Sequence, residues 1–243
     1  MRLHRFFVNE KLGVTEAITI KDHGLANQLG RVFRLKKGDE VVLFDGSGND
    51  FTCIISELKE DAVDFNIIES VKSRYMPARD IYLCASIVKK DNFEWIVEKA
   101  TELGVTHIIP VISERSEKKS LNEERLKKIA LEASEQSGRG NVPTIHGIIS
   151  LNELINSSAS SIPANTKLIA FHTEGVSEYG ELHISDICKD ESMAVFIGPE
   201  GGWSPDEIKL FQANNIPILC LGNQVLRAET AVVAILSQVV FKN

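Results

Sequence analysis

The sequence has no long hydrophobic run. No apolar stretch approaches the ~20 residues that a membrane-spanning helix needs, and the apolar part of the N-terminal segment, residues 1–9, is too short for a signal peptide. We therefore expect a cytoplasmic protein with no membrane partner. At 243 residues and 43% hydrophobic content, the chain suits one large domain, or a small domain followed by a medium one.

Cysteine is also scarce, and its spacing excludes the common cysteine frameworks. Cys53, Cys84, Cys188 and Cys220 are scattered and form no C-x-x-C pair. Most lie in apolar, strand-like runs, so we expect buried free thiols rather than a zinc site or disulfides. The six histidines show no metal-ligand spacing, so we predict no metal; only His172, at a predicted strand end, is kept as a site residue.

Several nucleotide and hydrolase motifs are missing. The chain contains no G-x-x-x-x-G-K-[ST], no G-x-G-x-x-G, no H-E-x-x-H and no G-x-S-x-G. A nucleotide hydrolase or a Rossmann dehydrogenase is therefore disfavoured.

Charge is distributed unevenly. The net charge of −7 argues against a protein that simply coats nucleic acid. Residues 1–37 nevertheless hold eight Lys or Arg against three acids, whereas residues 38–73 hold two against nine. The run from Arg31 to Lys37 contains four cations and no acid. It is either an ordinary solvated face or a local contact for phosphates.

The first part of the chain, residues 1–72, is predicted to be a β-barrel of five or six strands. The candidate strands are short and alternating or β-branched: 5–8, 17–20, 40–45, 50–58 and 62–71, with a helical turn at 22–29. A polar segment with a proline, residues 72–80, follows. We place the domain boundary there, with the second domain spanning residues 73–243.

From residue 81 onward strands alternate with helices. The predicted strands are 81–88, 107–111, 144–149, 167–171, 193–197 and 216–221. The predicted helices are 92–103, 122–137 and 151–156, one after Ser204 and one from about Ala228. This alternation is typical of an α/β domain with a largely parallel sheet and helices on both faces.

Three loops follow predicted strands of this domain and indicate one ligand site. They are His172 to Gly175, Gly198 to Gly202, and Gly222 to Leu226. The second loop runs into a helix start with Ser204 at N-cap, followed by Pro205 and by Glu207 at N3. Ligands of open α/β sheets bind outside the carboxyl ends of the strands. Because Arg227 is the only cation near these loops, an uncharged heterocycle and thioether suit them better than a triphosphate.

The loop residues also carry a family resemblance. G-P-E-G-G-W-S at 198–204 and L-G-N-Q-V-L-R-A-E-T-A at 221–231, with further motifs at 4–8, 44–46, 98–105, 114–116 and 132–139, appear in the order and spacing of one family. The chain resembles the SPOUT superfamily of S-adenosylmethionine-dependent RNA methyltransferases, and within it the RsmE family of 16S rRNA uridine-N3 methyltransferases.

The resemblance implies a PUA-like RNA-binding β-barrel, followed by a methyltransferase domain with a trefoil knot. It further implies a homodimer whose second subunit completes the site, and methylation of N3 of uridine 1498 of 16S rRNA in the small ribosomal subunit. Carried over residue by residue, the cofactor contacts are Phe171, His172, Thr173, Gly198, Pro199, Glu200, Gly201, Leu221, Gly222, Val225, Leu226 and Thr230.

Methylation at uracil N3 requires loss of a proton and stabilisation of the resulting oxyanion. Arg227 and Arg139 are candidates for the stabilising cation, and Glu229 or Glu200 for the proton acceptor. Ordinary roles remain open for two of them. Glu229 suits the first turn of a helix, where the dipole favours a carboxylate, and Arg139 suits a helix C-terminus between two glycines.

For RNA, we predict that phosphates are contacted by the basic residues Arg2, Arg5, Arg31, Arg34, Arg115, Lys118 and Lys119. The acidic total predicts that structured rRNA or the assembled subunit, rather than a naked oligonucleotide, is the substrate. The target base should be unpaired or flipped out.

Two competing hypotheses stay open at this point. One is a non-catalytic RNA-binding or ribosome-assembly factor with the same barrel; the other is a methyltransferase for a different base or a ribose 2′-hydroxyl. The last predicted helix is apolar nearly all round at 231–236, which fits burial of two faces and hence a homodimer.

Overall fold

The computed structural model describes residues 3–13, 17–116, 120–156, 161–173, 192–222 and 224–241. The chain divides into two compact units. The first comprises residues 1–76 together with 134–142, and the second comprises 77–133 together with 143–243. Within the described ranges, no helix combines the length and apolar character needed to cross a membrane.

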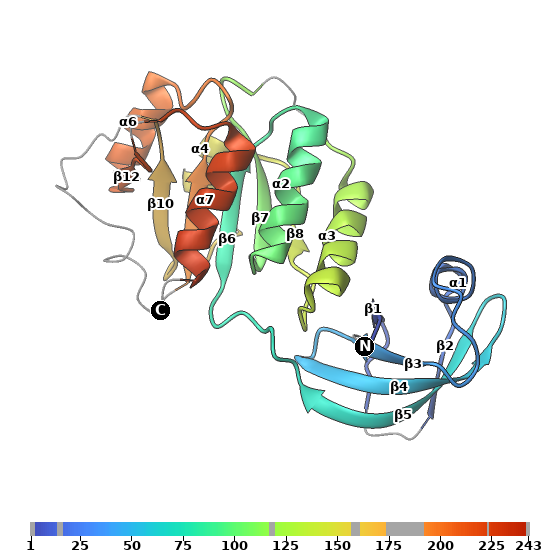
Figure 1. The fold of residues 1–243 in the computed structure, drawn as a ribbon. Helices are drawn as coiled ribbons and strands as arrows, with labels where there is room; N and C mark the ends of the chain where they lie inside the picture. Colours follow the sequence, from blue (N-terminus) through green and yellow to red (C-terminus); the bar gives the residue numbers. More distant parts are fainter. Residues whose placement is uncertain are drawn as a thin grey trace. The chain divides into compact units, whose positions relative to one another are not determined.

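The first unit is built on a sheet that has five strands in the described part of the chain (Figure 1). These are β1 (Arg5–Phe7), β2 (Ala17–Ile20), β3 (Glu40–Phe44), β4 (Asn49–Leu58) and β5 (Val63–Lys72), in the order β1-β3-β4-β5-β2. Strands β1 and β3 are parallel, and the other neighbours are antiparallel. Each predicted strand of this unit is confirmed to within one residue.

This sheet curls around one apolar core. Alternate residues of β4, Phe51, Cys53 and Ile55, point inward and are buried, as the alternating sequence predicts. They pack with buried side chains of every other strand, including Phe6 and Phe65. Among the described residues the edge strands β1 and β2 do not pair with each other, so the predicted barrel is a curled sheet here.

A longer helical segment than predicted follows β2. Helix α1 (His23–Asn27) starts at Asp22, whose carboxylate accepts the N–H of Leu25, and it continues as a π-helix, η1 (Gln28–Val32). Leu25 and Leu29 face the core of the sheet. The sequence predicts the first half of this segment, but no propensity distinguishes the π-helical half.

Buried polar contacts join the segment 134–142 to the sheet of the first unit. Arg5 donates to both carboxylate oxygens of Asp50, at 2.6 and 3.0 Å, and to the carbonyl of Arg139 at 2.9 Å. Glu135 accepts the backbone N–H of Phe7 at 3.0 Å. The Arg5 side chain is only 9% exposed, so its guanidinium is used inside the unit.

The second unit contains a parallel sheet. In the part of the chain that the structure describes, its strands are β6 (Ile81–Ser86), β7 (His107–Ile112), β8 (Thr144–Ile145), β9 (Ile149–Ser150), β10 (Lys167–Phe171), β11 (Met193–Ile197) and β12 (Ile218–Leu219). Their order is β12-β10-β11-β6-β7-β8, and β9 also pairs with β7. The predicted strand at 144–149 is thus two short strands, and β12 is shorter than predicted.

Helices cover both faces of this sheet. In Figure 1, α2 (Lys90–Glu102), α3 (Glu123–Ser137) and α7 (Ala228–Phe241) lie in front of it. Side chains of α4 (Leu151–Asn156) and α6 (Pro205–Ala213) pack on the opposite face, together with those of β6, β10 and β11. The predicted mixed α/β fold, with a β-rich first part and a parallel sheet in the second, is confirmed.

The cysteine prediction holds for two of the three described thiols. Cys53 and Cys84 are buried and free, and burial raises the pKa of both, that of Cys53 to about 12. Cys220 is free but exposed, so the expectation that it is buried is wrong. Its position just beyond β12 places it in a loop. Cys188 lies outside the described residues.

Protonation of a partly buried histidine pair makes the folding stability depend on pH. His107 and His146 are 3.1 Å apart between Nδ1 and Nε2, and His107 also stacks on Tyr82. Burial lowers the pKa of both imidazoles; nearby Asp80 opposes this at His107, and the neighbouring His107 adds to it at His146. Because the unfolded chain binds protons at a higher pH, this contribution to stability is present above about pH 6.5 and is lost as the pH falls below it.

We therefore expect the free energy of unfolding, measured in urea, to be lower at pH 5.5 than at pH 7.5. Replacing both histidines with glutamine should flatten that dependence. An equally steep dependence in the double variant would show that other groups cause it.

Candidate functional site

The register of three neighbouring strands brings the loops after them together. Phe171, the last residue of β10, pairs with Ile197 at the end of β11 and with Leu219 at the end of β12. The carboxyl ends of the three strands are therefore level. This is the edge of a parallel sheet at which ligands bind.

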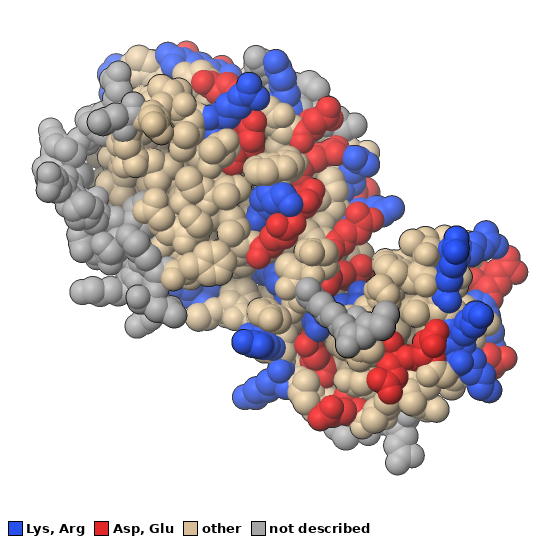
Figure 2. All heavy atoms as spheres, in the orientation of Figure 1, with Lys and Arg blue, Asp and Glu red and all other residues tan. Residues whose placement is uncertain are grey.

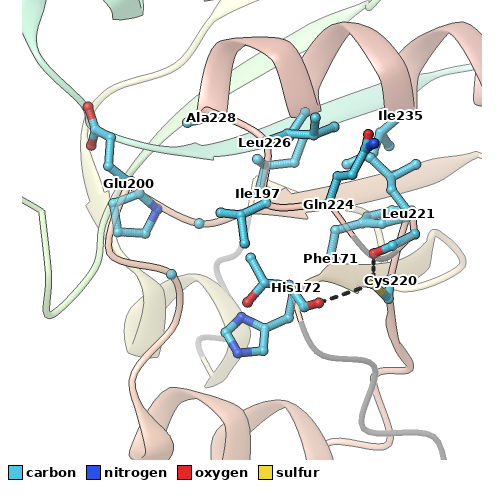
Figure 3. A pocket seen from close by; sticks show the side chains of 17 residues that line it. Phe171, His172, Ile197, Glu200, Cys220, Leu221, Gln224, Leu226, Ala228 and Ile235 are labelled. Atoms are coloured by element: carbon cyan, nitrogen blue, oxygen red, sulfur yellow. Dashed lines mark hydrogen bonds between the residues drawn. The ribbon is translucent and has the colours of Figure 1, made fainter.

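A hollow opens where these loops meet (Figure 3). It contains about 600 Å³ of empty space, part of it open to solvent. Figure 3 shows Glu200 at one end, Cys220 and Leu221 at the other, and Ala228 and Ile235 of α7 along one side. The lining residues are Phe171, His172, Thr173, Ile197, Gly198, Pro199, Glu200, Gly202, Cys220, Leu221, Gly222, Gln224, Val225, Leu226, Ala228, Ala231 and Ile235.

Most residues predicted to contact a cofactor line this hollow. Only Gly201 and Thr230 of that set do not. Seven lining residues are not among the predicted cofactor contacts: Ile197, Gly202, Cys220, Gln224, Ala228, Ala231 and Ile235. Of these, Gly202 and Gln224 lie in loops that the sequence predicts to form the site, and the other five were missed. A signal for three of them was available, because Ala228, Ala231 and Ile235 have the i, i+3, i+7 spacing of one helix face.

The loop after β11 is held in a fixed shape. Gly202 has a φ of +66°, and its N–H donates to the carbonyl of Pro199 at 2.8 Å, which closes a turn. The buried indole of Trp203 donates to the carbonyl of Phe171 at 2.9 Å. A Cβ on Gly198 would lie 3.3 Å from this indole. A larger residue at 198 would therefore press against the indole.

The predicted capping box of α6 is present, and it holds a second loop as well. Ser204 accepts the N–H of Glu207, and one carboxylate oxygen of Glu207 accepts the N–H of Ser204. The other oxygen accepts the N–H of Glu114 in the loop after β7. Arg115 in that loop donates to the carbonyl of Gly201 at 2.6 Å. Its guanidinium therefore supports the loop, although the side chain is exposed.

The loop after β12 joins the hollow to α7. Cys220 Sγ lies 3.2 Å from the carbonyl oxygen of Thr173 and 2.9 Å from that of Gly222 (Figure 3). The carbonyl of Arg227 accepts the N–H of Ala231 at 2.9 Å, so α7 begins at the hollow. The side chain of Val225 is 78% exposed, and a ligand or a protein surface can cover it.

The charges around the hollow limit what can bind. Among the described residues that line it, Glu200 is the only acidic residue and none is Lys or Arg. A polyphosphate would meet no cation there, and its own charge would be desolvated without compensation. The hollow therefore fits a neutral or positively charged ligand with an apolar body.

The predicted catalytic residues lie in different places. Arg227 is exposed and follows the lining residue Leu226. Glu229 is half-buried, and its Oε2 is buried with no hydrogen-bond partner among the described residues. Arg139 does not line the hollow; it belongs to the first unit, is 3% exposed, and burial lowers its pKa to about 10.

The predicted RNA contacts are also divided. Arg31 and Arg34 are exposed, whereas Arg5 pairs with Asp50 and its side chain is 9% exposed. A phosphate contact of Arg5 stays a prediction, and its partner, 45 residues away in the sequence, could not be read from local charge. Arg2, Lys118 and Lys119 lie outside the described residues.

Two protein families match the chain. Residues 75–240 match a family described as RNA methyltransferase domain, and residues 29–68 match one described as RNA methyltransferase PUA domain. The parallel sheet with its glycine-bearing loops and the curled sheet are thus those of an RNA methyltransferase with a PUA domain.

Individual relatives narrow this class. The chain is 30% identical to Ribosomal RNA small subunit methyltransferase E of Rickettsia conorii, covering 98% of this chain and 96% of the relative. It is 29% identical to the protein of that name from Bacillus subtilis, over 99% and 97% of the two chains. A crystal structure of Ribosomal RNA small subunit methyltransferase E from Neisseria gonorrhoeae bound to S-adenosyl methionine matches with a TM-score of 0.86 at 27% identity, covering 97% and 96%. The chain belongs to the ribosomal RNA small subunit methyltransferase E family.

Gly202 provides a test of the loop geometry. A side chain at a φ of +66° costs about 1–2 kcal/mol, and the added Cβ would lie 3.1 Å from His172 Cε1. We expect Gly202→Ala to lower the free energy of unfolding by about that amount in urea denaturation. Gly147→Ala is the matched control, because Gly147 has no positive φ and a Cβ there meets nothing within 4 Å. Equal stability of both variants would contradict the loop conformation.

Proposed function

We propose that this protein binds S-adenosylmethionine in the hollow and methylates N3 of a uridine, uridine 1498, in 16S rRNA of the small ribosomal subunit in the cytoplasm. The observation that carries the proposal is the hollow at the level ends of β10, β11 and β12, in a chain of this family. The names of the relatives support the rRNA substrate. The choice of base and position rests on the resemblance of the motifs.

The residues of the hollow fit this cofactor. Aliphatic and aromatic side chains such as Ile197, Leu226 and Phe171 suit an adenine ring, and backbone carbonyls and N–H groups of the loops suit its polar edges. S-adenosylmethionine carries a sulfonium, an ammonium and a carboxylate, hence a net positive charge. Glu200 matches that charge, and no Lys or Arg lines the hollow in the described residues. When bound, the cofactor supplies an electrophilic methyl group.

The protein's own residues must accept the proton of uracil N3 and stabilise the negative charge that its loss leaves on the uracil. Uracil N3 becomes nucleophilic as its proton leaves; the new N–C bond then forms as the S–C bond breaks, which gives 3-methyluridine and S-adenosylhomocysteine. Of the two candidate acids, Glu200 lines the hollow and Glu229 does not. We therefore assign to Glu200 the role of accepting the N3 proton. Arg227 immediately precedes α7 and follows the lining residue Leu226. From this position it can stabilise the uracil oxyanion.

We assign Glu229 and Arg139 supporting roles instead. Glu229 lies in the first turn of α7, where the helix dipole stabilises a carboxylate. Arg139 closes the end of α3 next to Asn141, to which it donates at 3.2 Å. These positions favour the ordinary structural role of each residue, which the sequence analysis left open beside a catalytic one.

The non-catalytic alternative explains the hollow less well. A pure RNA-binding factor needs basic and aromatic surface, but it has no use for an apolar hollow with tightly held glycine loops. A titration of S-adenosylmethionine separates the two: we expect saturable heat in calorimetry at one site per chain. No heat would favour the binding factor.

A homodimer fits the outer face of α7. Thr230, Ala234, Ser237 and Phe241 lie on one stripe of this helix, and Phe241 is 66% exposed. The Ser237 hydroxyl donates within the helix, to the carbonyl of Ala234 at 2.8 Å. Figure 2 shows uncharged surface over the position of α7. We propose that a second copy covers this face.

Arg227→Gln tests the oxyanion role. Because Arg227 does not line the hollow, we expect the Kd for S-adenosylmethionine to stay unchanged while kcat falls roughly 100-fold or more. The assay is methyl transfer to small ribosomal subunits purified from a strain that lacks this protein. A kcat within a few-fold of the wild type would exclude this role.

Ala234→Glu tests the dimer. A carboxylate at the half-buried centre of the α7 stripe is desolvated when a second copy covers it, so we expect a monomer by light scattering where the wild type is a dimer. Ala164→Glu, at an exposed position of the same unit, should stay dimeric. A monomeric wild type, or a dimeric Ala234→Glu variant, would contradict the proposed interface.

The substrate is tested by mass spectrometry of small-subunit rRNA nucleosides. In a strain without this protein we expect 3-methyluridine to be absent and to return with the wild-type gene. Loss of a different methylated nucleoside would retain the methyltransferase and reject the uridine-N3 assignment.

A further inference from the structure

Phe33, the residue after η1, forms a partly exposed aromatic cluster with His4 and Phe6 on the first unit. Phe33 is 38% exposed, and its ring packs edge-on against the buried ring of Phe6, with centroids 5.4 Å apart. The exposed ring of His4 lies 4.5 Å from it at a tilt of 48°. Neighbouring Val32 is 64% exposed. One face of the cluster is thus fixed by the core, while part of it remains open to solvent.

Basic residues flank Phe33 in the sequence. Arg31, Arg34, Lys36 and Lys37 are all exposed, and none of them forms an ion pair with any residue that the structure describes. Two acids are close: Asp39 accepts the backbone N–H of Lys36, and Glu60 lines a hollow together with Arg31. In Figure 2 basic side chains gather, with some acidic ones, around the part of this unit that carries α1. Four free cations are notable in a chain whose net charge is −7.

The backbone here is unusual on both sides of Phe33. The π-helix η1 ends at Val32, and Arg34 has a φ of +57°, which is costly for a residue with a long side chain. The N–H of Phe33 still bonds to the carbonyl of Gln28, and that of Leu35 to Leu29. π-Helical turns and strained residues are frequent at functional sites. Their coincidence with an exposed aromatic ring favours function over a simple core cover.

We propose that Phe33, supported by His4, is a stacking platform for an unpaired RNA base, and that Arg31 and Arg34 contact the phosphates on either side of it. Stacking on an aromatic ring contributes strongly to single-strand binding and tolerates any base, while the cations add affinity that falls with salt. The site holds RNA; it does not touch the reacting base. The inference rests on the proposed function only in taking RNA as the partner.

The experiment measures binding of an RNA hairpin with an unpaired loop, and of the fully paired duplex of its stem, by the full-length protein. We expect Phe33→Leu to weaken hairpin binding about 5- to 100-fold and to leave duplex binding unchanged, because leucine keeps the apolar contact with Phe6 but offers no ring. Phe33→Trp should bind the hairpin like the wild type. Its additional tryptophan fluorescence should be quenched by the hairpin and not by the duplex.

Arg34→Asn separates the charge from the fold. Asparagine tolerates positive φ, so we expect unchanged thermal stability and a slope of log affinity against log salt that is smaller by about one. Wild-type hairpin affinity in Phe33→Leu, or unquenched fluorescence in Phe33→Trp, would overturn the proposal. The fluorescence result decides the matter even if Phe33→Leu fails to fold.

Failure here is distinguishable from failure of the proposed function. S-adenosylmethionine binding uses the second unit alone, so it stays intact if Phe33 has no role in RNA binding. If instead the Phe33 variants lose only binding to intact small subunits and keep hairpin affinity, a ribosomal protein surface is the partner and the stacking proposal is wrong.

Discussion

The parallel register of β10 with β11 and β12 is the constraint on which the rest of the second unit depends. It places Phe171, Ile197 and Leu219 at one level, so the loops that follow must share one space. The buried indole of Trp203 fixes that space by bonding the end of β10 to the loop after β11. If the strand ends were not level, these glycine-bearing loops would not meet in one space.

The hollow of the second unit and the surface around Phe33 of the first unit differ in charge. The hollow has an acid and, in its described lining, no cation, which suits a positively charged cofactor and repels free polyphosphates. Four exposed cations that form no ion pair with a described residue lie on the first unit, in the sequence next to Phe33: Arg31, Arg34, Lys36 and Lys37. An overall charge of −7 weakens unspecific attraction to RNA, so recognition depends on local contacts. This arrangement favours a folded RNA that offers phosphates and an unpaired base together.

Local sequence rules predicted much of this structure. Alternation predicted β4, and the Ser204 to Glu207 spacing predicted the start of α6. The loops around Gly198 and Gly222, which line the hollow, were predicted because glycines follow buried strands there. What the sequence does not reveal depends on distant partners. The second bond of Glu207, to the N–H of Glu114, is one such contact. The burial of Arg5 against Asp50 is another, and no local pattern reveals either.

The most direct measurement is a crystal structure of this protein grown with S-adenosylmethionine. We predict that the adenosyl group lies between the loops after β10, β11 and β12, against Leu226 and Gly198, with the methionyl end toward Glu200. A cofactor bound elsewhere on the chain, or a hollow filled by side chains in the presence of saturating cofactor, would contradict it.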